Sequence, residues 1–141
     1  MCYRFTKNPA YLQQARHIAD FFFGLPNLPE DMVPYWDMKA PGIPDIPRDA
    51  SAAAIMASAL YELRTYVSAE DGNRYQSIAD KIVDSLNRLN QHYQAEPGTT
   101  YGFLLLHSTG HHPGGDEIDV PINYADYYYL EALARKEALK Q

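Results

Sequence analysis

Two stretches of this chain repeat one helical pattern at a distance of 64 residues. The recurring residues are Tyr11, Ala15, Ile18 and Asp20 and, 64 positions later, Tyr75, Ala79, Ile82 and Asp84. Their apolar members stand three and four positions apart, which is the spacing of one face of a helix. A second pair, Leu60 and Leu63, recurs 70 positions later as Leu130 and Leu133. Repeats of this length predict stacked helical hairpins.

The signals at helix ends predict four helices. Asn8-Pro9 combines a capping side chain with a proline in the first turn, and Gly24 ends that helix. Asp49 or Ser51 can cap the second helix, which Asp71-Gly72 is expected to break. The predicted helices cover about 9–23, 51–66, 73–89 and 123–139, and two long connections, 24–48 with six prolines and 91–121, lie between them.

The repeat predicts an all-α fold of antiparallel helical hairpins, with residues 1–141 as one domain of two hairpins. Each hairpin pairs an amphipathic helix with a more apolar one, Ala-rich in the first copy and Tyr-rich in the second. We expect the amphipathic helices outside and the apolar ones inside. Because about three such units are needed for a stable array, we also expect exposed helix edges and a homo-oligomer.

Charge and composition exclude several classes of partner. The formal net charge of −6 argues against nucleic acid and against anionic membrane surfaces. No apolar run reaches the length of a membrane span, and one cysteine excludes an intrachain disulfide. The opening residues lack the apolar segment of a signal peptide, and the compartment, cytoplasmic or periplasmic, stays open.

Residues 107–121, HSTGHHPGGDEIDVP, gather side chains of the kinds that bind metals: His107, His111, His112 and Asp116. A metal site needs three or four such ligands to converge, and the spacing in this Gly/Pro-rich stretch does not force convergence. We therefore expect a structured loop, with no metal and no cofactor.

Several blocks of the chain resemble glycoside hydrolase family 88, the unsaturated glucuronyl hydrolases. They are MCYRFTKNPAYLQQA at the start, PYWDMKAPGIPDIPRDASAAAI (34–55), SALYEL (58–63) and YGFLLLHSTGHHPGGDEIDVPINYADYYYLEAL (101–133). The resemblance implies an (α/α)6 barrel of six inner and six outer helices, of which this chain is about the C-terminal third. It also implies a substrate, an unsaturated uronic-acid oligosaccharide left by polysaccharide lyases.

The family chemistry implied by this resemblance is hydration of a vinyl ether. An aspartic acid protonates the double bond, water adds beside the ring oxygen, and the resulting hemiketal opens and expels the aglycone. The two essential aspartates of the family lie in the first half of the barrel and match no position here, so no catalytic residue is assigned and the chain is expected to be inactive alone. A related hydrolase of unsaturated galacturonides is the alternative within this class; a helical-repeat module that only self-associates is the alternative outside it.

The resemblance also indicates residues for substrate binding. In some family members a serine and a basic residue of the matching loop contact a sulfate or the leaving sugar, and Ser108 with His111 or His112 occupies a comparable place. Histidine is only partly charged near neutral pH, so sulfate selectivity is left open.

Three further residues complete the predicted binding set. Trp36 either plugs helix ends, the favoured interpretation, or stacks on a sugar. Arg48 either pairs with a loop carboxylate or binds the substrate carboxylate through two hydrogen bonds. Tyr101 is expected by position to face the sugar. Asp119 and Asp126 are acids near the barrel axis on this interpretation, but neither is assigned a catalytic role.

Overall fold

The computed structural model describes residues 1–88 and 92–140, and within them the fold is helical without a strand. The longer helices agree with the expected hairpins: an amphipathic helix, a long connection and a more apolar helix, twice. The elements are α1 (Cys2–Thr6), α2 (Pro9–Phe23), α3 (Ala50–Leu63), η1 (Arg64–Tyr66), α4 (Ala69–Leu86), η3 (Thr100–Gly102), η4 (His112–Gly114) and α5 (Asn123–Ala138). None of the helices in this described part is both long and apolar enough to cross a bilayer.

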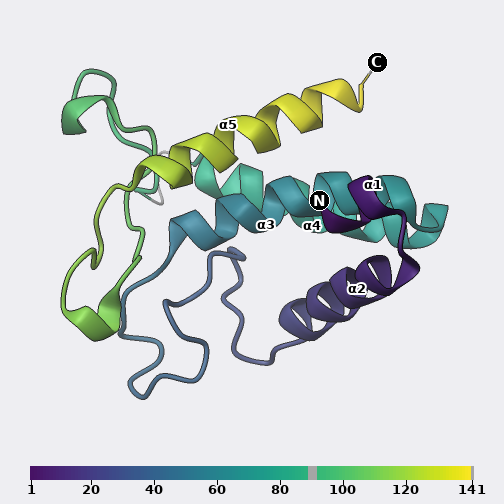
Figure 1. The fold of residues 1–141 in the computed structure, drawn as a ribbon. Helices are drawn as coiled ribbons and strands as arrows, with labels where there is room; N and C mark the ends of the chain where they lie inside the picture. The colour runs from purple at the N-terminus through teal and green to yellow at the C-terminus, as the bar shows by residue number, and fades with distance from the viewer. Residues whose placement is uncertain (89–91, 141) are drawn as a thin grey trace.

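The two apolar helices α3 and α5 lie side by side and run in the same direction (Figure 1). Helix α4 packs against α3, and α2 lies beside both, with a small contact to α3 and side-chain hydrogen bonds to α4. Both long connections gather at the amino-terminal ends of α3 and α5, whereas α3 and α4 are joined by a short turn at the opposite end (Figure 1). The long loops therefore share one end of the helical layer.

Side-chain caps set the starts of the helices. The Asn8 side chain accepts a hydrogen bond from Ala10 N at 3.0 Å. Asp49, not Ser51, caps α3 by accepting from the backbone N–H groups of residues 51 and 52. The Ser51 hydroxyl itself donates to the Asp49 carboxylate.

The predicted boundary between the second and third helices was wrong. Asp71 and Gly72 do not break a helix but lie in the first turn of α4, where the Ser68 hydroxyl caps Asp71 N at 3.2 Å. Gly72 is needed there because a Cβ would lie 3.0 Å from the carbonyl oxygen of Arg64. The predicted Leu89 end of this helix lies outside the described residues.

The core forms where α4 and α5 cover α3. The large side chains that are almost fully buried include Tyr61, Tyr75, Ile82, Leu86 and Leu105. Small alanines on α3 and α5 let the two helices approach closely. The predicted face of the third helix is thus confirmed as a core face, whereas the equivalent face of α2 leaves Ile18 58% exposed.

Three buried tyrosines share one arrangement, in which an aspartate accepts from a tyrosine hydroxyl and also pairs with a cation. The three tyrosine–aspartate–cation triads are Tyr75–Asp20–Arg74, Tyr93–Asp31–Arg48 and Tyr61–Asp80–Lys136. Each triad joins segments that are far apart in the sequence, so these tyrosines help to hold the packed segments together.

The triads also shift the ionisation of their members. The hydrogen bond donated by Arg74 lowers the pKa of Asp20. Burial alone would raise the pKa of Asp80, but the hydrogen bonds from Tyr61 and Lys136 outweigh it and lower that pKa below its ordinary value. Burial and the neighbouring Asp80 carboxylate raise the pKa of Tyr61 far above its ordinary value, so its hydroxyl stays a neutral donor.

Candidate functional site

The two long connections are tied to each other around the amino-terminal end of α3. Ala50 N donates to the carbonyl of His107 at 3.0 Å, and the Thr109 hydroxyl donates to the carbonyl of Arg48 at 3.0 Å. Thr109 N also donates to the capping carboxylate of Asp49. One aspartate therefore begins a helix and anchors a distant loop.

A second aspartate anchors the same connection to α5. The Asp126 carboxylate accepts hydrogen bonds from the backbone N–H groups of Leu104 and Leu105, both at 2.9 Å. The apolar run before His107 does not form a strand; Leu105 makes one isolated bridge with Gln94. Asp126 thus positions the loop backbone.

An open cleft of about 1200 Å³ lies between the two connections. The polar side chains on its wall include Asp45, Arg48, Tyr93, Glu96, His107 and Asp119. The cleft carries both signs of charge, one phenol ring and imidazole rings, which are groups that can bind a sugar with a carboxylate. We take it as the candidate site.

Arg48 is held rigidly on this wall. Its Nε donates to the carbonyl of Val33 at 2.9 Å, its guanidinium pairs with Asp31, and its Cζ lies 5.0 Å from the centre of the Tyr35 ring. The loop-carboxylate alternative for Arg48 is therefore observed, and the same side chain also faces the cleft.

Next to Arg48, the imidazole of His107 is oriented by a carboxylate. Its Nδ1 lies 2.7 Å from Asp119 Oδ1, and its ring meets that of Tyr93 edge-on with centroids 6.1 Å apart. Both His107 and Asp119 adopt positive φ, 60° and 56°, a conformation that is uncommon for residues other than glycine. A carboxylate that accepts from Nδ1–H fixes the tautomer of the neutral ring and leaves Nε2 as a hydrogen-bond acceptor.

Sequence reasoning assigned no binding role to His107, Asp119 or Tyr93. Tyr93 was overlooked altogether, because no periodic pattern marks a residue between a helix and a turn. Burial raises the pKa of its hydroxyl well above the ordinary value, so Tyr93 remains a hydrogen-bond donor to Asp31 at 3.0 Å. Tyr93 lines the cleft and holds Asp31, which in turn pairs with Arg48. We therefore include Tyr93 in the candidate site.

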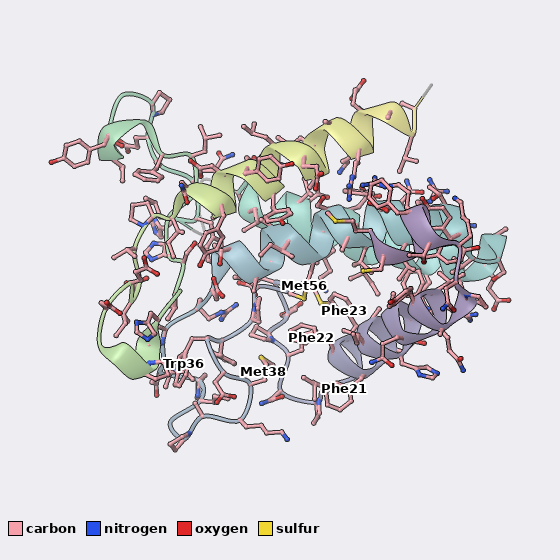
Figure 2. All side chains as sticks on the ribbon, viewed as in Figure 1. Phe21, Phe22, Phe23, Trp36, Met38 and Met56 are labelled. Carbon is pink, nitrogen blue, oxygen red and sulfur yellow. The ribbon has the colours of Figure 1, made fainter. Side chains whose placement is uncertain are left out.

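Trp36 and His112, both in the predicted binding set, lie together away from the cleft wall. Their rings stack with centroids 3.9 Å apart and an angle of 2° between planes, and Figure 2 shows Trp36 beside the η4 turn. The imidazole covers one face of the indole, and Trp36 N donates to the carbonyl of Pro47 at 3.0 Å. The stack joins the two connections.

The remaining predicted residues, Ser108, His111 and Tyr101, are dispersed. Ser108 is fully buried, and its hydroxyl has no hydrogen-bond partner among the described residues. His111 Nδ1 lies 2.5 Å from Asp116 Oδ1 at an exposed loop tip. Tyr101 is fully exposed in η3, with φ 53°, and is not part of the cleft wall. Their substrate contacts remain predictions.

The ligand-type side chains of 107–121 separate into two histidine–aspartate pairs, His107–Asp119 and His111–Asp116. Across residues 1–88 and 92–140, no three histidine, cysteine or carboxylate side chains lie close enough to hold a metal ion. The loop instead folds back on itself through an isolated bridge between Ser108 and Val120.

Comparison with known proteins gives relatives that match almost the whole chain, although no family model matches it. An unsaturated glucuronyl hydrolase of Formosa agariphila is 49% identical over 139 residues, 99% of this chain and 34% of the relative. One of Bacillus sp. strain GL1 is 36% identical over 95% of this chain and 35% of the relative. An unsaturated chondroitin disaccharide hydrolase of Streptococcus pyogenes is 31% identical over 96% of this chain and 33% of the relative.

Solved structures agree with the sequence relatives. An unsaturated glucuronyl hydrolase specific for heparin superposes with a TM-score of 0.92 and 44% identity, over 98% of this chain and 36% of its own. The Bacillus sp. GL1 enzyme superposes with a TM-score of 0.84 and 31% identity, over 96% of this chain and 35% of its own. The expected fold class, helical hairpins that form part of an (α/α)6 barrel, is confirmed. The chain spans about a third of the length of the curated relatives it matches, and over that third its homologues are unsaturated glucuronyl hydrolases of glycoside hydrolase family 88, whose C-terminal part it matches.

Proposed function

We propose that this chain is the C-terminal portion of an enzyme that removes Δ4,5-unsaturated uronic acid from lyase-generated oligosaccharides by hydrating the vinyl ether. The observation that carries the proposal is the match to an unsaturated glucuronyl hydrolase, 49% identical over 99% of the chain. Relatives named as hydrolases of unsaturated chondroitin disaccharides support the same substrate class. A structure of a Streptococcus agalactiae relative with a bound unsaturated disaccharide supports it further.

In this proposal the chain supplies one wall of the sugar site. Arg48, held by Asp31, is a fixed positive charge for the uronate carboxylate. The His107–Asp119 pair offers an oriented imidazole nitrogen to a hydroxyl of the sugar. Proton donation to the double bond is assigned to aspartates outside this chain, so the chain alone is expected to bind weakly and to turn over no substrate.

The test has two readouts, binding and turnover. An unsaturated chondroitin disaccharide is titrated into the chain and followed by NMR, and loss of the double bond is followed by ultraviolet absorbance. We expect chemical-shift changes at the backbone amides of Arg48 and Asp119 on the cleft wall. His107→Ala should abolish them, and Lys81→Ala, on the exposed side of α4, should leave them unchanged. Robust turnover by the chain would refute the assignment of the catalytic acid elsewhere, and absence of any shift would refute the sugar wall.

Specificity within the class is tested with the same titration. Binding of a sulfated disaccharide is compared with binding of an unsulfated one, which tests whether Ser108, His111 and His112 contact a sulfate. An unsaturated galacturonyl disaccharide tests the alternative relative. Tighter binding of the galacturonide than of the glucuronide would favour that alternative.

A second candidate function is self-association through exposed helix edges, without catalysis. It is favoured by apolar side chains that stay exposed in the described structure, among them Tyr11, Ile18, Ile55, Tyr127 and Leu130. We expect the isolated chain to form homo-oligomers whose size rises with concentration. A monomer by light scattering at every concentration would remove this candidate.

A further inference from the structure

The side chains that line the cleft direct most of their hydrogen-bond donors into the protein. Nε of Arg48 donates to the Val33 carbonyl at 2.9 Å, and one terminal nitrogen of its guanidinium pairs with Asp31. The Tyr93 hydroxyl donates to the same aspartate at 3.0 Å. Within the described part of the chain, the donor that these two side chains leave for a ligand is the second terminal nitrogen of Arg48, Nη1.

Two further polar side chains of the cleft wall use their donors in the same way. The side-chain amide of Gln94 donates to Asn87 Oδ1 at 3.0 Å and to the Tyr129 hydroxyl at 2.9 Å. The Thr99 hydroxyl donates to the carbonyl of Glu96 at 2.6 Å. The atoms that these two side chains leave for a ligand are therefore oxygen acceptors.

The remaining groups on the cleft wall are mainly acceptors, and they carry negative charge. His107 Nδ1 lies 2.7 Å from Asp119, and a neutral ring that donates from Nδ1 keeps Nε2 as an acceptor. Asp45, Glu96 and Asp119 are exposed carboxylates on the wall, and within the described residues none of them pairs with a lysine or an arginine. Asp45 comes from one connection and the other two from the second, so the carboxylates lie on both sides of the cleft. The exposed imidazole of His92 can serve as donor or acceptor.

This balance of donors and charges decides which substituent of a sugar fits the cleft wall. A sulfate group has no hydrogen to donate at neutral pH, and it brings negative charge toward three carboxylates. An acetamido group offers one N–H donor and no charge. An ammonium group offers three donors and a positive charge, and its hydrogen bonds to carboxylates are stronger than those between neutral groups. The cleft wall therefore favours a ligand with an ammonium group.

We propose that the cleft wall selects, as the sugar next to the unsaturated uronic acid, an amino sugar whose amino group is unsubstituted and positively charged. The proposal rests on the proposed function, because that sugar reaches the wall as the neighbour of a uronic acid whose carboxylate binds Arg48. Arg48 then binds the anionic end of the substrate, and Asp45, Glu96 and Asp119 bind the cationic sugar. Acetylation or sulfation of the amino group removes the charge that the wall recognises.

The test titrates three monosaccharides into this chain: glucosamine, N-acetylglucosamine and glucosamine N-sulfate. Because none of them contains a uronic acid, they probe the cleft wall independently of the proposed function. The readout is the chemical shift of the backbone amides of Glu96 and Asp119, followed by NMR at about pH 6.5, at which amines are largely protonated. We expect glucosamine to bind at least about tenfold more tightly than glucosamine N-sulfate, an effect of about 1.4 kcal/mol on binding, with N-acetylglucosamine between them. Added salt should reduce the difference.

Two variants test whether the carboxylates cause this preference. Glu96→Gln and Asp45→Asn keep the size of each side chain and remove its charge, so each should reduce the preference for glucosamine by about threefold, as for an exposed ion pair. Glu137→Gln is the matched control, because it removes one charge at the far end of α5, where Glu137 pairs with Lys140; it should leave the preference unchanged. Equal affinities for the three monosaccharides, or a preference that neither wall variant reduces, would overturn the proposal.

Unsaturated uronyl disaccharides of the same three amino sugars separate this proposal from the proposed function. Tighter binding of the disaccharide with a free amino group than of glucosamine, with the same order among the three disaccharides, supports both. Equally tight binding of all three disaccharides keeps the proposed function and overturns the selection of the amine. The expected order among the monosaccharides, without any gain from the uronic acid, keeps the selection of the amine and counts against the proposed function.

Discussion

Replacing Asp49 by alanine tests whether one carboxylate holds α3 and the loop of the candidate site together. Asp49 Oδ1 accepts from Ser51 N at 3.0 Å, Ala52 N at 3.3 Å and Thr109 N at 3.3 Å. The first two contacts cap α3, and the third fixes the 107–121 loop. Asp49→Ala removes all of them at once.

The expected loss follows from these contacts. A helix cap contributes about 1 kcal/mol, and the hydrogen bond from Thr109 to a partly buried charged acceptor contributes about 1.5 kcal/mol. The free energy of unfolding should therefore fall by about 2 to 3 kcal/mol. With a urea m-value of about 2 kcal/mol/M, the midpoint moves down by about 1 to 1.5 M.

The assay is urea unfolding followed by circular dichroism, repeated at two protein concentrations so that self-association does not enter the comparison. Asn8→Ala is the matched control, because Asn8 caps α2 through a single hydrogen bond and has no loop contact; it should cost about 0.5 to 1 kcal/mol. Amide hydrogen exchange should accelerate at Thr109 only in Asp49→Ala. Equal losses in the two variants, with Thr109 protection unchanged, would refute the link between cap and loop.

Three further changes have expected outcomes that the same unfolding assay measures. Leu86→Ala empties a fully buried site and should cost about 2 to 5 kcal/mol, whereas Leu130→Ala, 52% exposed, should stay within about 0.5 kcal/mol of wild type; similar costs would contradict the assigned core. Gly72→Ala should destabilise, against the usual gain for alanine in a helix, because its Cβ meets the Arg64 carbonyl oxygen at 3.0 Å; a gain would show that the turn relaxes. Folding lowers the pKa of Asp80, so the stabilisation from its carboxylate is present above about pH 3.9 and is lost as the pH falls further. In Asp80→Asn the free energy of unfolding should therefore fall less steeply between about pH 5 and pH 2. An unchanged pH dependence of the free energy of unfolding would contradict this role.

The sequence predicts the helices where local chemistry dominates. Asn8-Pro9 and the apolar spacing of the third helix act within one or two turns, and both predictions hold. The boundary at Asp71-Gly72 was misread, since glycine in a helix is usually a sign of an ending. Here Gly72 is placed where a side chain would meet the carbonyl oxygen of Arg64 in the preceding turn. That contact forms only after the chain has reversed direction between α3 and α4.

The candidate site was harder to predict because its contacts join distant loops. The sequence identified Arg48 and left two partners open, a loop carboxylate or the substrate carboxylate. In the structure Arg48 pairs with the loop carboxylate of Asp31. The pairing of His107 with Asp119 and the stacking of Trp36 on His112 depend on how two connections fold over α3. No periodicity or motif encodes such contacts, so the individual side chains could be chosen but not their partners.

The tyrosine–aspartate–cation triads have a consequence for behaviour in concentrated salt. Dissolved ions screen the attraction between an exposed carboxylate and its cation, as for Asp20 and Arg74, but they have little effect on a hydrogen bond from an uncharged phenol. Each such aspartate therefore keeps its hydrogen bond from the tyrosine when salt weakens its ion pair. Where a triad joins helices, as Tyr75 with Asp20 and Tyr61 with Asp80 do, we expect the helix alignment to depend only weakly on ionic strength.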